Sequence, residues 1–118
     1  MRIEYGASRI VVLTKRFAFK FPRVHGKNFA YGQLDSLCKG IMHNIREYEF
    51  SKMNNPYLCP IVFHIRGLLN VMPKVPLLLE EDMIYFGFPD ELTSHIVEEK
   101  ADSWGVLNGQ LVAIDYSG

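Results

Sequence analysis

Two aspartates flank the last apolar segment of the chain, Asp102 before it and Asp115 at its end. Inside this segment an Asn108-Gly109 pair separates two apolar runs, which is typical of a two-residue β-hairpin turn. An antiparallel hairpin places the start of its first strand beside the end of its second, so we expect the two carboxylates to lie close together. Two carboxylates, with water or phosphate oxygens completing the shell, suit Mg²⁺. The other interpretation, which spacing alone favours, is that Asp102 caps a turn and Asp115 is a solvated strand end.

A single lysine, Lys20, interrupts an aromatic run in the first third of the chain. Because side chains alternate between the two faces of a strand, the three phenylalanines of Phe17–Phe21 share one face, and Lys20 shares the other with Ala18. Such a lysine either lays its methylene stem along an edge of the sheet and keeps its amine in water, or directs the amine at an anion. The sequence favours the first arrangement.

The first half of the chain predicts a β-hairpin followed by the main helix. Segments 8–13 and 17–21 are β-branched and aromatic, which is typical of paired strands. A helix is expected from Asp35 or Ser36 to Met53. Its inward stripe is expected to consist of Leu37, Ile41, Ile45 and Tyr48.

Two glutamates, Glu47 and Glu49, lie on opposite flanks of that stripe. Either can reach a partner at the boundary between helix and sheet. Solvation at the surface is the default expectation for both.

The second half predicts a further hairpin, formed by segments 59–65 and 68–72 with an Arg66-Gly67 turn. Pro73 and Pro76 then predict an extended connector, because proline removes a backbone donor and restricts the residue before it.

Segment 77–85 after the connector is expected to form a short apolar helix or turn. A second helix over about 89–100, with Leu92 and Ile96 inward, precedes the closing hairpin. The chain therefore predicts a single α+β domain over residues 1–118, with an antiparallel sheet of about five to seven strands and one main packed helix.

Composition and charge limit the function. The chain has 118 residues, of which 48% are hydrophobic, enough for one domain with its own core. Two cysteines, no signal peptide and no apolar run near the ~20 residues of a membrane span predict a cytoplasmic protein without disulfides and without membrane attachment. Zero formal net charge argues against bulk attraction to nucleic acid. The four histidines are scattered without metal-ligand spacing.

The order of the elements resembles the nucleotide-binding part of the protein-kinase-like fold, which includes the aminoglycoside phosphotransferases. The strand Phe17–Phe21 is similar to the kinase strand whose lysine holds the ATP phosphates, and residues 6–11 are similar to a reduced phosphate loop. The resemblance implies that Lys20 contacts phosphate. It also implies that Glu47, with Glu49 as the alternative, pairs with that lysine.

The closing hairpin carries the rest of the kinase resemblance. Val112–Ser117 is similar to the strand that ends in Asp-Phe-Gly, with Tyr and Ser in place of Phe and Gly. The metal-binding asparagine of the family stands thirteen residues before that aspartate, a position that Asp102 occupies here. Residues 69–76 correspond to the hinge between lobes. The resemblance therefore implies that Asp102 and Asp115 hold Mg²⁺ beside an ATP bound at Lys20.

The chain also resembles small proteins of tailed bacteriophages over nearly its whole length. The shared features are a Gly-x-Ser-Arg start at Gly6–Arg9, the lysine strand, a Cys-Pro-Ile strand at Cys59–Ile61, and an ending like Lys-x-Asp-Ser-x-Gly at Lys100–Gly105. This resemblance implies a phage protein that acts in the cytoplasm of its bacterial host.

Two departures from the kinase pattern decide the expected function. The catalytic aspartate of the family lies five residues before the metal-binding position, where this chain has Val97. Only three residues follow Asp115, so no substrate lobe is expected. The sequence therefore predicts a degenerate, non-catalytic kinase-like protein that binds and modulates a host or phage protein. The alternative is a nucleotide- and Mg²⁺-binding phosphotransferase or autokinase.

Exposed aromatic side chains are the expected anchors for a protein partner. The candidates are Tyr5, Tyr31, Tyr57, Tyr85 and Trp104. A purely structural interpretation also remains open, in which Lys20, Glu47 and Asp115 form an ion-pair cluster that holds the helix against the sheet without any ligand.

Overall fold

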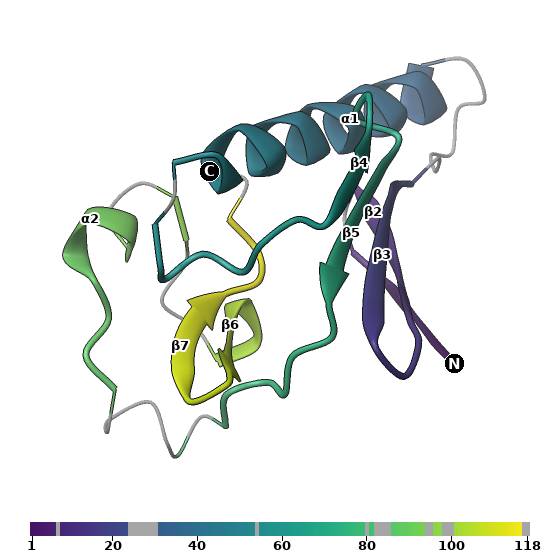
Figure 1. The fold of residues 1–118 in the computed structure, drawn as a ribbon. Helices are drawn as coiled ribbons and strands as arrows, with labels where there is room; N and C mark the ends of the chain where they lie inside the picture. Colours follow the sequence, from purple (N-terminus) through teal and green to yellow (C-terminus); the bar gives the residue numbers. More distant parts are fainter. Residues whose placement is uncertain are drawn as a thin grey trace.

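Seven strands and one long helix dominate the computed structural model, which describes residues 1–6, 8–23, 31–53, 55–79, 81, 86–93, 96–97 and 101–116 (Figure 1). The elements are β1 (Arg2–Tyr5), β2 (Arg9–Leu13), β3 (Phe17–Pro22), α1 (Tyr31–Ser51), β4 (Phe63–Ile65), β5 (Leu69–Pro73), α2 (Asp90–Thr93), the 3₁₀ turn η2 (Ala101–Ser103), β6 (Trp104–Leu107) and β7 (Gln110–Ala113). The predicted α+β class is confirmed, with one antiparallel sheet ordered β1-β2-β3-β5-β4 and a separate β6–β7 hairpin.

Two hairpin turns have the backbone that their sequences predict. Arg66 and Gly67 have φ values of 41° and 78°, and Asn108 and Gly109 have φ values of 51° and 81°. Positive φ at both central residues is the requirement of a type I′ turn, which matches the twist of the flanking strands.

Strand β4 begins at Phe63, four residues later than predicted, because the segment before it pairs elsewhere. Cys59 donates its backbone N–H to the Ala113 carbonyl at 2.9 Å, and Leu58 forms a parallel bridge with Ala113. The segment after α1 therefore pairs with the end of β7 through Leu58 and Cys59.

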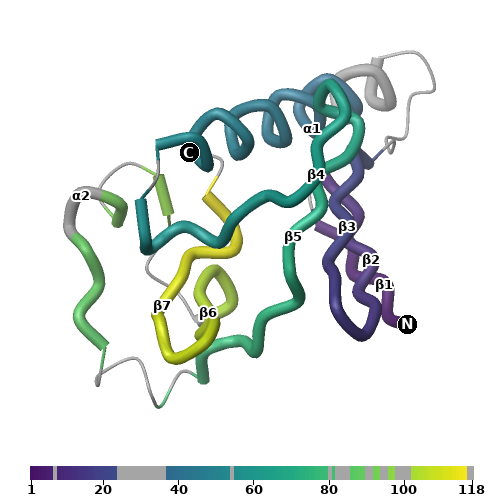
Figure 2. Tube along the Cα trace, in the orientation of Figure 1, coloured from purple at the N-terminus to yellow at the C-terminus, as the bar shows by residue number. Residues whose placement is uncertain are grey.

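The five-stranded sheet has one polar face and one apolar face. The inner face carries Lys20 and Asn70, both buried, and lies toward α1 and the β6–β7 hairpin (Figure 2). The outer face, defined by Ile3, Tyr5, Ile10, Val12, Phe17, Phe19, Phe21, Phe63, Ile65, Leu69, Val71 and Pro73, has no charged residue among these strand positions. The predicted sharing of faces along β3 is confirmed, but the expectation that Lys20 keeps its amine in water at a sheet edge is wrong, because Lys20 points into the protein.

Helix α1 presents a different face from the predicted one. Among its described side-chain positions, 37–51, the buried ones are Gly40, Asn44 and Glu47, whereas Ile45 is 39% exposed. The helix also begins at Tyr31, before the expected cap, and ends at Ser51. The predicted inward stripe is therefore wrong at Ile45, because the helix turns toward a polar sheet face and buries the side chains that can hydrogen-bond to it.

The apolar core lies under the β6–β7 hairpin, around Trp104, Val112 and Tyr116. Leu92 of α2 is buried there, as predicted, and Ile96 is partly buried against it.

The expected helix over 89–100 is wrong in its middle, because α2 ends at Thr93 and residues 96–97 form a turn; residues 94–95 and 98–100 lie outside the described residues. Leu77 is an extended residue bridged to Gly105, so the expected helix or turn over 77–85 does not begin there, and residues 82–85 also lie outside the description. No described helix is long and apolar enough to cross a membrane.

Gly40 sets the distance between α1 and the sheet. A Cβ added there would lie 2.6 Å from Pro22 Cα and would also clash with the Ser8 carbonyl oxygen. We expect Gly40→Ala to lower the free energy of unfolding by about 1–3 kcal/mol, in spite of the better helix propensity of alanine. Urea denaturation measures this loss. Gly87→Ala is the control, since no heavy atom lies within 4 Å of its added Cβ, and equal effects of the two substitutions would contradict the close approach.

Candidate functional site

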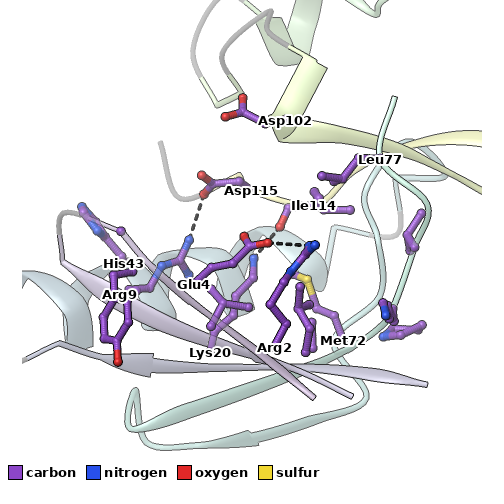
Figure 3. A pocket seen from close by; sticks show the side chains of 18 of the residues that line it. Arg2, Glu4, Arg9, Lys20, His43, Met72, Leu77, Asp102, Ile114 and Asp115 are labelled. Atoms are coloured by element: carbon purple, nitrogen blue, oxygen red, sulfur yellow. Dashed lines mark hydrogen bonds and ion pairs between the residues drawn. The ribbon is translucent and has the colours of Figure 1, made fainter. Parts of the chain in front are cut away.

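Four charged side chains from four separate elements meet at the inner face of the sheet. They are Arg9 on β2, Lys20 on β3, Glu47 on α1 and Asp115 after β7, and together they form the ion-pair cluster. Lys20 Nζ lies 3.0 Å from Glu47 Oε2. Arg9 Nη2 lies 2.8 Å from Asp115 Oδ1 (Figure 3).

Strand register and helix packing bring these side chains together. Val11 pairs with Lys20, so Arg9, two residues before Val11, points to the same face as Lys20. Asn44 Nδ2 donates to the carbonyl oxygens of Lys20 and Gly67 at 3.1 and 2.9 Å, which pins α1 to β3 and to the β4–β5 turn. Glu47, three residues after Asn44, then lies on the same side of the helix and over both cations.

Glu47 is the centre of the cluster and is fully buried. Its Oε1 and Oε2 accept from Lys20 Nζ at 3.1 and 3.0 Å and from Arg9 at 3.1 and 3.3 Å. Asn70 Nδ2 and the Tyr116 backbone N–H donate to it at 3.3 and 3.4 Å. A buried carboxylate is tolerated only with such a full set of donors, because removing it from water costs several kcal/mol.

The surroundings of the cluster favour the charged forms of Glu47 and Arg9 but disfavour the charged form of Lys20. Burial opposes the charge on Glu47, but Lys20 and Arg9 together outweigh it and hold the pKa of Glu47 below its usual value. Burial also opposes the charge on Arg9, and the attraction of Glu47 and Asp115 outweighs it, so the pKa of Arg9 is raised. For Lys20, burial dominates over the attraction of Glu47 and lowers the pKa of the amine.

The cluster forms part of the wall of a cleft of about 870 Å³ between the sheet and the closing hairpin. Clefts of this size are typical of small-molecule sites. The charged residues on its walls are Arg2, Glu4, Arg9, Lys20, Lys74, Asp102 and Asp115. Counting Glu47 behind Lys20, four cations face four anions, so the cleft has no excess charge of either sign.

The two aspartates named from the sequence lie on the hairpin side of this cleft (Figure 3). Asp115 is half exposed, with a side-chain accessibility of 51%, and bonds to Arg9. Asp102 lies in η2, is exposed, and also lines the cleft. Among the described residues no group of three or more His, Cys, Asp or Glu side chains is placed to hold a metal ion. Mg²⁺ commonly takes one or two protein carboxylates and completes its shell with phosphate oxygens and water, so Asp102 and Asp115 are side chains on this cleft with the chemistry to hold it.

Lys20 and Glu47 are in direct contact, so the default expectation of a solvated Glu47 is wrong, whereas Glu49 is exposed. Sequence reasoning missed Arg9, Asn44 and Asn70. Arg9 and Val11 are two residues apart on a predicted strand and therefore share one face, and this spacing was a signal for Arg9.

A second polar pair lies near the cleft mouth. Ser8 Oγ and His43 Nδ1 are 2.6 Å apart, and both residues line the cleft. Burial, followed by the charge of Arg9, lowers the pKa of His43, which favours the neutral imidazole.

The five aromatic candidates separate into different environments. Tyr5 is 65% exposed, whereas Trp104 is fully buried in the core and Tyr57 packs against it. The side chains of Tyr31 and Tyr85 lie outside the description. Of the three that are described, Tyr5 is the one available to a partner.

Comparison of the chain with protein-family models, with curated proteins and with solved structures gives no match.

Removing the charge of Glu47 tests its central position. We expect Glu47→Gln to lower the free energy of unfolding by about 3–5 kcal/mol, because Lys20 and Arg9 then lose their shared carboxylate inside the protein. Urea denaturation monitored by Trp104 fluorescence measures the change. Glu49→Gln is the matched control, since Glu49 is exposed on the same helix and a surface substitution changes stability by about 0.5 kcal/mol or less. A loss for Glu47→Gln no larger than that of the control would contradict the geometry.

The pH dependence of stability follows from the lowered pKa of Glu47. A carboxyl whose pKa is lower in the folded state than in the unfolded chain, where it is near 4.5, contributes its full stabilisation above that pH and loses it as the pH falls toward the folded value. We expect the denaturation midpoint to fall as the pH drops below about 4.5. In Glu47→Gln this acid slope should be shallower, and identical slopes in both proteins would show that Glu47 is not the group responsible.

Proposed function

We propose that the chain is a kinase-like binding protein that holds a magnesium–nucleotide complex in its cleft without transferring the phosphoryl group. The observation that carries the proposal is the contact of Lys20 on β3 with both carboxylate oxygens of Glu47 on α1, beside a cleft of about 870 Å³. In protein kinases a β3 lysine paired with a helix glutamate is one of the parts that must be in place for ATP to be held productively.

Of the hydrogen-bond acceptors of Lys20, the Ile114 carbonyl oxygen is the one that a ligand could replace. Two of its hydrogen bonds go to Glu47. A third goes to the Ile114 carbonyl oxygen (Figure 3). A phosphate oxygen is a better acceptor for an ammonium group than a neutral carbonyl, because both partners are then charged. Phosphate entering the cleft would replace Ile114 as the third partner while Glu47 keeps the amine oriented.

Magnesium is part of the proposal because the cationic and anionic side chains of the cleft are equal in number, so the cleft has no excess positive charge for a polyphosphate. A polyphosphate by itself would meet as many anions as cations, and Asp102 and Asp115 would repel it. Asp102 and Asp115 would hold a Mg²⁺ ion, which would supply the missing positive charge beside the phosphate. Asp115 is half exposed and is therefore accessible from the cleft.

Binding without transfer follows from the residue at the catalytic position. Val97 is 2% exposed and packs in the apolar core, so it offers neither a carboxylate nor access to a substrate hydroxyl. Phosphoryl transfer needs a group that accepts or orients that hydroxyl. The phosphotransferase or autokinase alternative is accordingly not favoured by the geometry.

The action of such a protein would be to engage a macromolecule, which the phage resemblance suggests is a protein of the phage or of its host's cytoplasm. Tyr5 supports this part of the proposal, because it is exposed at the end of the edge strand β1 and the guanidinium of Arg23 lies 5.1 Å from its ring centroid. Tyrosine and arginine are over-represented among the residues that dominate binding energy at interfaces. Affinity capture from bacterial lysate should then recover a stoichiometric partner that Tyr5→Ala loses, and repeated capture without such a partner would contradict it.

A thermal-shift titration tests the nucleotide site. We expect ATP and MgCl₂ together to raise the melting temperature saturably, by roughly 10 °C at a hundredfold excess over Kd, and either ligand alone to do much less. Lys20→Met and Asp115→Asn should abolish the shift. Lys52→Met is the matched control, because Lys52 lies at the end of α1 over the Tyr48 ring and does not line the cleft.

Folding and binding must be separated in this test. Circular dichroism of each variant before heating shows whether it is folded at the starting temperature. A wild-type protein that shows no saturable shift with both ligands would sink the proposal and leave the cluster with its structural role alone. Transfer of label from ATP to the protein would instead show that the chain is an enzyme.

A further inference from the structure

The outer face of the sheet presents an apolar surface that the packing inside the chain does not use. Along one row, Ile3, Val12, Phe19, Val71 and Phe63 follow one another across all five strands, each paired with the next by strand register. The half-exposed members of the face are Ile3 (45%), Phe17 (39%), Phe21 (37%), Phe63 (53%) and Ile65 (43%). Contiguous apolar surface of this kind marks an interaction site on a soluble protein.

The polar inner face explains why this surface exists. In a sheet covered on one side, the apolar residues normally face the covering layer and the polar ones face water. Here the buried face carries Lys20, Arg9 and Asn70, so the alternation of side chains places the phenylalanines of β3 on the opposite face. The ion-pair cluster and the exposed apolar face are two consequences of one strand register.

We propose that a second copy of this chain covers the outer face, so that the two five-stranded sheets pack against each other as a two-fold dimer. With about 200 Å² for each large side chain, the five half-exposed members of the face present about 430 Å² per copy. Two copies would bury about 870 Å² from these side chains alone, and the partly exposed Ile10, Val12, Phe19 and Leu69 bring the total to about the 1,000 Å² that a specific interface should clear.

Charge favours a second copy over a charged partner. The strand residues of the outer face carry no charge with which to select an acidic or basic protein, and the Arg23 guanidinium at its edge lies over the Tyr5 ring. The chain has zero net charge, so two copies approach without net repulsion. A twisted sheet is also complementary to an identical sheet, since face-to-face sheets pack about 10 Å apart at about −30° with interleaved side chains. In a two-fold interface the same patch serves both partners.

Light scattering coupled to size exclusion gives the first test. We expect a mass near twice the 13.6 kDa of the chain at micromolar concentration, and a melting temperature that rises with protein concentration. Phe21→Asp and Phe63→Asp, each exposed in the single chain, should both give monomers, because a two-fold interface receives every introduced charge twice. Met42→Asp is the matched control, since Met42 is 47% exposed on α1 and away from the outer face, and it should remain dimeric.

The proposal is overturned if the wild-type protein stays monomeric up to about 100 μM, or if both aspartate variants keep the dimer mass. The wild-type measurement does not depend on the variants folding. Nucleotide binding in the cleft is measured separately, so failure of the dimer leaves the proposed function untouched, and failure of the nucleotide site leaves the dimer untouched.

Discussion

The burial of the Glu47 carboxylate is the constraint on which the rest of this structure depends. A carboxylate without access to water must be surrounded by donors, and here two cations, an amide and a backbone N–H supply them. These donors come from β2, β3, β5 and the segment after β7, so the site is complete only when sheet, helix and closing hairpin have all assembled. Within the described residues no buried side-chain nitrogen or oxygen is left without a partner.

The same cluster joins the two halves of the chain. Arg9 bonds to Asp115, Lys20 bonds to the Ile114 carbonyl, and the Tyr116 backbone donates to Glu47. The sheet and the closing hairpin are therefore coupled through the residues that line the cleft. A ligand that exchanged with Ile114 at Lys20, or drew Asp115 away from Arg9, would act on the contacts that hold the halves together. The structural and ligand-binding roles of the cluster thus share the same atoms.

The polar inner face also constrains the outside of the molecule. Strand alternation leaves no intermediate arrangement, because a sheet that turns lysine, arginine and asparagine inward must turn its phenylalanines outward. The cleft and the outer face lie on opposite sides of one sheet, so occupation of one does not obstruct the other. Ligand binding and self-association are compatible in the same molecule.

The amino-acid sequence by itself determined the α+β class, the positions of the hairpin turns and every strand except β1, because Asn108-Gly109, Arg66-Gly67 and the β-branched runs act over a few residues. It also singled out Lys20, Glu47, Asp102 and Asp115 as the residues with chemistry to offer. Only the tertiary structure decided which face of each element is buried, because that depends on what packs against it. Helical spacing favoured Ile45 as an inward residue, yet the sheet face opposite α1 is polar and selects Asn44 and Glu47 instead. The full buried cluster, Arg9 included, could not be predicted from local sequence patterns. A carboxylate can be buried only where cations distant in sequence are brought to it.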